Sequence, residues 1–188
     1  MPFLSFIDEK SFILFPSSLI LESSFKFLSE EISEILLFDK YKLESLVNDF
    51  KGSTFEIGKG NLLKDGSDIT LIANGIMVAE ALKTAEKLKN EGINAAVIDM
   101  FTLNPIDKEL IETYAQKTGK IVTCENHSIH NGLGSAVAEV IAETGNAKLR
   151  RIGIKERFGQ VGTLDFLMNE YELTAEHIYK AAMELLKD

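Results

Sequence analysis

The side chains best suited to chemistry in this sequence are gathered in one short stretch, between Cys124 and His130. A thiol, the Glu125 carboxylate and the imidazoles of His127 and His130 follow one another closely there. A metal site would need ligands from several elements in a fixed geometry, and the remaining histidine, His177, is distant in the sequence. The spacing matches no metal-ligand motif, so no metal site is predicted.

The same stretch offers a candidate nucleophile and a candidate acid–base pair. Cys124 ends an apolar run, where a lone cysteine usually behaves as a small buried hydrophobe. Glu125 and His127 could hydrogen-bond, orient each other or contact a partner chain. Because charged pairs at strand ends are often purely structural, we favour orientation over catalysis, and no catalytic residue is predicted.

A glycine-containing segment, Gly132-Leu-Gly134-Ser135, follows and opens a helical pattern. Backbone amides at a helix start can hold an anion. The segment is not a full dinucleotide fingerprint, because Val137 stands where the third glycine belongs and no acidic residue ends the next strand. Close packing of a helix against a strand is the better interpretation of its glycines.

The elements that must position these residues alternate along the chain. Compact apolar runs bounded by turn signals predict buried strands, and amphipathic stretches between them predict helices. This alternation implies right-handed crossovers and a mostly parallel sheet covered on both faces, an α/β fold with three α/β/α layers. The predictions are strands at 69–73, 93–98, 120–124 and 149–154, turns at 58–60 and 64–67, intervening helices, two short closing helices, and N-caps at Asp107 and Thr174.

The predicted fold also places a candidate site. In open parallel sheets, ligands bind beyond the carboxyl ends of the strands, near the point where the strand order reverses. Polar side chains follow the predicted strand ends. The candidate ligand or interface residues are Asn74, Asp99, Glu125, His127 and His130.

The amino-acid composition limits the binding partners and the cellular compartment that we expect for the protein. The net charge of −9 opposes binding to nucleic acid or to an anionic membrane surface, and neither is expected as a partner. The single cysteine excludes an internal disulfide and suits a reducing cytosol, so a cytoplasmic location is expected. The apolar residues 12–21 are interrupted by Pro16 and are too few to span a bilayer, and Asp8 and Glu9 stand where a signal peptide needs basic residues.

A change of composition divides the chain near residue 52. No glycine or alanine precedes Gly52, whereas both are common afterwards, and a domain normally needs glycine for its turns. We expect one α/β domain at residues 53–188, preceded by an extension at residues 1–52. Three interpretations of this extension compete: a helical arm, a poorly ordered segment, or the product of a disrupted reading frame joined to an intact domain. We favour the last two together over the first.

The region after Thr54 resembles the transketolase C-terminal domain along its length. The segments that carry the likeness, in order, are Phe55-Glu-Ile-Gly-Lys-Gly-Asn-Leu-Leu63, Asp68-Ile-Thr-Leu-Ile-Ala-Asn-Gly75, Thr102-Leu-Asn-Pro-Ile-Asp107, Val122-Thr-Cys-Glu-Asn-His127, Gly132-Leu-Gly-Ser-Ala-Val137, Ile152-Gly-Ile-Lys-Glu-Arg-Phe-Gly159 and Leu173-Thr-Ala-Glu-His-Ile178. The sequence departs from the family at Asn126, where a second glutamate is usual, at His130-Asn131, where Gly-Gly is usual, and at Glu172, where a glycine is usual.

The resemblance implies a role in two-carbon ketol transfer between sugar phosphates, as in the carbohydrate metabolism of the pentose phosphate pathway. In this family, thiamine diphosphate binds between an N-terminal and a middle domain, usually across a dimer, and the middle domain supplies the glutamate that activates it. We expect no cofactor bound by this chain alone, and thiamine diphosphate with Mg²⁺ only in an assembled enzyme. The expected partner is an N-terminal transketolase section or a homodimer partner.

Three hypotheses for function follow. The leading one is a C-terminal domain or subunit of a transketolase, which supports assembly and is inactive without the cofactor-binding domains. The second is a stand-alone interaction or small-ligand-binding module that uses the strand-end residues. The third is a truncated remnant without activity.

Overall fold

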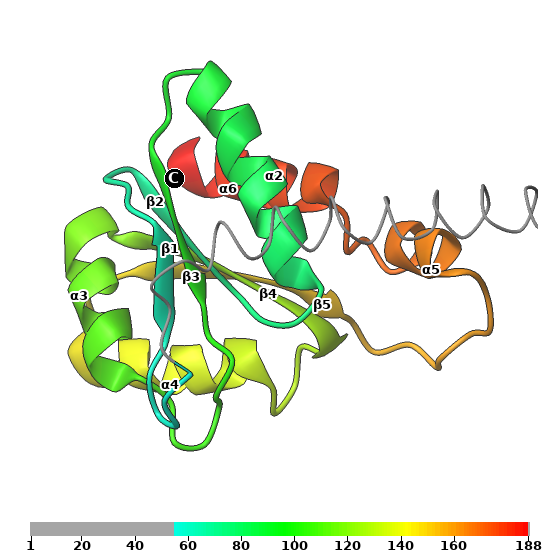
Figure 1. Ribbon diagram of the computed structural model, residues 1–188, viewed down its shortest axis with the longest axis horizontal. Helices are drawn as coiled ribbons and strands as arrows, with labels where there is room; N and C mark the ends of the chain where they lie inside the picture. The colour runs from blue at the N-terminus through cyan, green and yellow to red at the C-terminus, as the bar shows by residue number, and fades with distance from the viewer. Residues whose placement is uncertain (1–54, 188) are drawn as a thin grey trace, which may run out of the picture. The chain divides into compact units, whose positions relative to one another are not determined.

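A five-stranded sheet forms the centre of the structure, a computed structural model that describes residues 55–187. The extension expected at residues 1–52 lies outside the described residues. The strands are β1 (Asn61–Lys64), β2 (Ile69–Ala73), β3 (Ala95–Asp99), β4 (Lys120–Ser128) and β5 (Lys148–Ile154). They lie in the order β1-β3-β2-β4-β5, with β1 antiparallel to β3 and all other neighbours parallel (Figure 1).

Helices cover both faces of this sheet, which confirms the three-layer α/β/α prediction (Figure 1). One apolar cluster joins the sheet to α2 (Met77–Asn90), α6 (Ala175–Lys187) and the short α5 (Leu164–Glu170). A second cluster joins the opposite face to α3 (Lys108–Thr118) and α4 (Leu133–Thr144). None of the helices in the described part of the chain is long and apolar enough to cross a membrane.

The central strands are largely apolar because both of their faces are covered, and Thr70 in β2 and Asp99 in β3 are the polar exceptions. All residues of β2 and β3 are buried, and neighbouring side chains point to opposite faces. Leu71 belongs to the cluster under α2 and α6, whereas Ile72 belongs to the one under α3 and α4. The helix after β3 begins as predicted, since Oδ1 of Asp107 accepts a hydrogen bond from Leu110 N at 3.1 Å.

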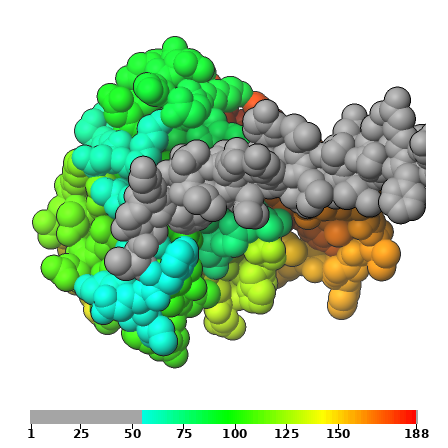
Figure 2. All heavy atoms as spheres, in the orientation of Figure 1, coloured from blue at the N-terminus to red at the C-terminus, as the bar shows by residue number. Residues whose placement is uncertain are grey.

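The edge strand β1 was not predicted, because the sequence indicated only turns on either side of it. It has four residues and no long apolar run, and its pairing with β3 shifts register between Leu62 and Lys64. Figure 2 shows the cyan atoms of this first described region at the surface. β3 begins later than predicted, at Ala95, and β4 runs past its predicted end to Ser128, through a register shift against β5.

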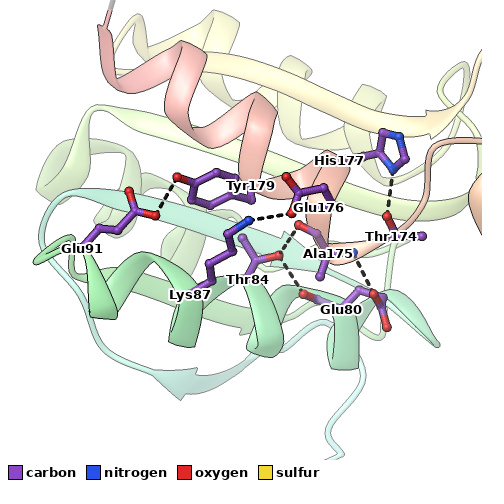
Figure 3. A network of polar contacts seen from close by, with 9 residues as sticks. All are labelled: Glu80, Thr84, Lys87, Glu91, Thr174, Ala175, Glu176, His177 and Tyr179. Atoms are coloured by element: carbon purple, nitrogen blue, oxygen red, sulfur yellow. Dashed lines mark hydrogen bonds and ion pairs between the residues drawn. The ribbon is translucent and has the colours of Figure 1, made fainter.

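Thr174 stands at the N-cap position of α6, as predicted, because its carbonyl accepts a hydrogen bond from Ile178 N at 3.2 Å, and a side chain of α2 also contacts this helix start. Oγ1 of Thr174 lies 2.8 Å from Nδ1 of His177, while Oε2 of Glu80 accepts a hydrogen bond from Ala175 N at 2.7 Å (Figure 3). The Thr84 hydroxyl lies within hydrogen-bond distance of Ala175 O, at 3.0 Å. A carboxylate from a neighbouring helix thus satisfies a free amide at the positive end of α6, beside the predicted N-cap residue.

Candidate functional site

Three of the five candidate residues lie at the carboxyl edge of the sheet, on adjacent strands. β2 runs between β3 and β4, and Ala73 at its end pairs with both Asp99 and Cys124. Asn74 N donates a hydrogen bond to Cys124 O at 3.3 Å, which joins the end of β2 to β4. The structure therefore brings Asn74, Asp99 and Glu125 to the point where the strand order reverses.

The Glu125 carboxylate occupies the amino-terminal end of α4. Glu125 is 1% exposed, and its two oxygens accept hydrogen bonds from Leu133 N and Gly134 N, both at 2.8 Å. Gly132 leaves the room for this contact, since a Cβ there would lie 1.9 Å from Oε2 of Glu125. Amides at a helix start suit an anion. Here the chain fills that position with its own carboxylate.

The second glycine of this segment serves packing, as the sequence indicated. A Cβ on Gly134 would lie 2.7 Å from Cδ of Arg151 and 2.9 Å from Oγ1 of Thr123, so α4 approaches β4 and β5 closely. Arg151 also donates a hydrogen bond from Nη1 to Ile129 O at 2.9 Å, which ties β5 to the turn after β4. These contacts fix the turn after β4, which carries His130, whereas His127 lies within β4 itself.

A different set of polar groups, beside β3, has no hydrogen-bond partner. Asp99 is 5% exposed, and its carboxylate accepts no hydrogen bond from any residue that the structure describes. Burial raises the pKa of Asp99 to about 6. Nδ2 of Asn61 and Oδ1 of Asn74 are likewise buried without a partner within residues 55–187. Because buried polar atoms are normally paired, this corner suits an ordered water or a small polar ligand.

Sequence reasoning missed Asn61 in this corner. Asn61 lies directly opposite Asp99 in the antiparallel pair of β1 and β3, so their side chains share a face of the sheet. The one sequence signal was a polar residue between Gly60 and an apolar pair, and it had no meaning until β1 was known to be a strand.

The two histidines stand apart from this edge. Both are exposed, and no hydrogen bond joins His127 to Glu125 among the described residues. Nδ1 of His127 lies 3.1 Å from Ser128 O, and Nε2 of His130 lies 3.7 Å from Oε1 of Glu156. Cys124 is fully buried, and burial, reinforced by the neighbouring Glu125 charge, raises the pKa of its thiol. It is the buried hydrophobe that was predicted.

The described residues form no evident metal centre. Within residues 55–187, no group of three or more His, Cys, Asp and Glu side chains is placed to hold a metal ion. The amides most suited to a diphosphate, those at the start of α4, are already bonded to Glu125. These residues therefore do not fit a metal-bound diphosphate.

The fold and the site together define a class of protein: a three-layer α/β domain with a mostly parallel sheet. In this domain a glutamate of the chain itself occupies the helix start best suited to an anion. The family described as "Transketolase, C-terminal domain" matches residues 58–178, and the chain belongs to it. The resemblance inferred from the ordered sequence segments is thereby confirmed.

Individual relatives extend this family assignment. The putative transketolase C-terminal section of Methanocaldococcus jannaschii is 51% identical over 136 residues, which cover 72% of this chain and 42% of that protein. The 6-deoxy-6-sulfo-D-fructose transketolase subunit SqwH of Clostridium sp. (strain MSTE9) is 46% identical over 137 residues, 73% of this chain and 42% of that one. A solved structure described as a split gene transketolase, inactive beta4 tetramer, is 45% identical, with a TM-score of 0.68 over 71% of this chain and 44% of its own. The chain thus spans about two fifths of these relatives.

Proposed function

We propose that this chain is the C-terminal section or subunit of a transketolase, which supports assembly and does not catalyse ketol transfer alone. Its relatives are named as a transketolase C-terminal section, a transketolase subunit and a split gene transketolase. The matched region spans about two fifths of their length, so the proposed activity depends on domains beyond that region.

The observation that carries this proposal is the position of Glu125. A sugar phosphate is an anion, and the helix start at the carboxyl edge is where an open α/β sheet would receive it. The Glu125 carboxylate takes up both Leu133 N and Gly134 N there. Repulsion between two negative groups would oppose a phosphate at the same place. The edge that usually carries chemistry serves the domain's own structure instead.

The chemistry is therefore assigned to domains beyond the described residues. Thiamine diphosphate with Mg²⁺ would supply the carbanion chemistry of ketol transfer in the assembled enzyme. No step is assigned to a residue of this chain, because its described residues do not fit that group. The sugar substrates are those of a transketolase of the pentose phosphate pathway in the cytoplasm, or a sulfonated sugar like the one named for the Clostridium relative.

The test is reconstitution of the enzyme. The full chain is mixed with the complementary N-terminal section in the presence of thiamine diphosphate and Mg²⁺, and ketol transfer between sugar phosphates is measured. We expect activity from the mixture and none from either section alone. The absence of both association and activity would refute the proposal.

A second candidate, a small-ligand-binding module, is favoured by the unpaired groups at Asn61, Asn74 and Asp99. A neutral polar metabolite seated there would satisfy them and raise the melting temperature of wild type. The Asp99→Asn variant should respond differently to the same metabolite. A flat response of wild type to a panel of polar metabolites would exclude this candidate.

A further inference from the structure

Two Asn-Gly pairs occur in the sequence, and the structure gives them different surroundings. Asn74-Gly75 joins β2 to α2, and Asn131-Gly132 lies in the yellow-green loop between β4 and α4 (Figure 1). Asn74 is half-buried with its Oδ1 enclosed, whereas Asn131 is exposed and its side-chain amide makes no hydrogen bond within residues 55–187. Glycine has no side chain to shield its backbone nitrogen, so in both pairs that nitrogen is sterically open to the asparagine amide.

The peptide that joins Asn131 to Gly132 makes no hydrogen bond of its own. Neither Asn131 O nor Gly132 N is bonded to any residue that the structure describes. On one side of this peptide, Oγ of Ser135 accepts a hydrogen bond from Asn131 N at 2.9 Å, and on the other, Gly132 O accepts one from Ala136 N at 3.1 Å. The chain is therefore fixed before and after the peptide, while the peptide itself can turn without losing a bond.

The corresponding peptide of the other pair is bonded. Asn74 O accepts a hydrogen bond from Met77 N at 3.1 Å, at the start of α2. Turning that peptide breaks this bond, and the loss slows any reaction that requires the turn by about tenfold. Asn74-Gly75 is thus an internal comparison, because the same dipeptide occurs in the same chain with its peptide held in place.

The backbone at Asn131 suits closure of a ring onto its own side chain. Such a ring contains the Cα–C bond of Asn131 but not its N–Cα bond, so ψ must change while the observed φ of 59° can remain. Turning the peptide over changes ψ of Asn131 and φ of Gly132 in opposite senses and leaves the neighbouring segments in place. The φ of Gly132, now −110°, becomes positive, which glycine adopts readily, and its nitrogen moves towards Cγ of Asn131.

We propose that Asn131 is a site of spontaneous deamidation. Gly132 N attacks Cγ of Asn131, so that the N–Cγ bond forms, the Cγ–Nδ2 bond breaks, and ammonia leaves with the proton of the Gly132 N–H. Water then opens the resulting succinimide at either carbonyl and gives aspartate or isoaspartate at this position. The reaction needs no enzyme and no redox partner. Because Gly-Gly is usual in the family where His130-Asn131 stand, the site comes from this chain's own departure from the family pattern.

The products of this reaction disturb the start of α4. Isoaspartate lengthens the main chain by one carbon atom immediately before Gly132, where a Cβ would already lie 1.9 Å from Oε2 of Glu125 and 3.1 Å from Ser128 O. Gly132 cannot shift without moving Leu133 N, which donates a hydrogen bond to the Glu125 carboxylate at 2.8 Å. Deamidation therefore loosens this helix start, and the melting temperature falls as the protein ages.

The test follows the full chain as it ages in mildly alkaline buffer, as wild type and as Asn131→Gly, which restores the glycine usual in the family. Peptide mapping by mass spectrometry with electron-transfer fragmentation measures aspartate and isoaspartate at Asn131 and at Asn74. A parallel sample in concentrated urea reports on both pairs without the fold. We expect about tenfold more product at Asn131 than at Asn74 in the folded chain, and nearly equal amounts in urea.

Thermal unfolding of the same samples tests the consequence for α4. The melting temperature of wild type should fall as product accumulates, and that of Asn131→Gly should stay constant. Equal product at the two pairs in the folded chain, or none at Asn131, would overturn the inference. The same excess at Asn131 in urea would also refute it, since the local sequence and not the structure would then set the rate. Product at Asn131 with an unchanged melting temperature would disprove the loosening of α4.

Discussion

Oε2 of Glu125 lies where a side chain at Gly132 would have to begin, since a Cβ there would be 1.9 Å from that oxygen. The glycine is therefore required by a close approach between a loop and a buried carboxylate. The same carboxylate satisfies the first free amides of α4, so the fit at Gly132 and the start of this helix depend on each other.

Replacing Gly132 with alanine should unfold the protein more easily. The added methyl group displaces the Glu125 carboxylate from Leu133 N and Gly134 N, which leaves buried donors unpaired and costs about 2–3 kcal/mol of unfolding free energy. Gly159→Ala is the matched control, because nothing lies within 4 Å of a Cβ there. Urea denaturation compares the two variants. Equal stability of both would show that the loop relaxes freely.

Removing the Glu125 side chain should create an anion site. In Glu125→Ala the amides of Leu133 and Gly134 lose their acceptor, which destabilises the protein by about 2 kcal/mol or more. Phosphate or sulfate should then recover part of that loss by binding at the start of α4. The measurement is melting temperature in sodium phosphate against sodium chloride at equal ionic strength. An identical salt response in wild type and variant would contradict the expectation.

The sequence predicted the strands whose residues form compact apolar runs. β2 and β3 are buried on both faces, so their residues are apolar except for Thr70 and Asp99, and the alternation of strands with helices leaves few topologies. β1 escaped prediction because a four-residue edge strand needs no such run. Asn61, whose side-chain amide is unpaired, was therefore not predicted as a site residue either.

The candidate site was predictable only as far as it depends on strand ends. Asn74, Asp99 and Glu125 follow from the rule for open parallel sheets, and the structure places them together. The positions of His127 and His130 could not be predicted from this rule, because β4 continues to Ser128 through a register shift that the sequence does not reveal. Beyond that shift, the alternation of side chains cannot be counted from Cys124.

The stability of the protein should fall as pH rises through the titration of Asp99. Burial raises its folded-state pKa from 3.8 to about 6, so the folded state binds the proton more tightly than the unfolded state does. The favourable contribution is complete below about pH 4 and is lost between about pH 4 and pH 6, up to about 3 kcal/mol. Asp99→Asn should gain relative to wild type across this window. A constant difference between the two proteins in denaturation from pH 4 to 7 would disprove the assignment.

Replacing Glu172 with glycine should stabilise the protein. Glu172 has a φ of 59°, in the left-handed region that favours glycine, and glycine is the usual family residue there. Relief of this strain should outweigh the exposed pair with Lys155, for a net gain of about 1 kcal/mol in unfolding free energy. Asn131, also at 59°, provides the control, since asparagine tolerates this conformation and Asn131→Gly should gain less. A loss in Glu172→Gly would mean that the Lys155 pair dominates.

The hydrogen bond between Glu80 and Ala175 N should stabilise the first turn of α6. Glu80→Ala removes the carboxylate that accepts a hydrogen bond from Ala175 N, so the first turn of α6 should exchange its amide hydrogens faster and stability should drop by about 1 kcal/mol. Glu91→Ala is the control from the same pair of helices, because it removes only an exposed hydrogen bond from the Tyr179 hydroxyl (Figure 3). That loss should be a few tenths of a kcal/mol. Hydrogen exchange followed by mass spectrometry compares the α6 amides of the two variants. Equal protection of these amides in both variants would show that apolar packing alone holds α6 to α2.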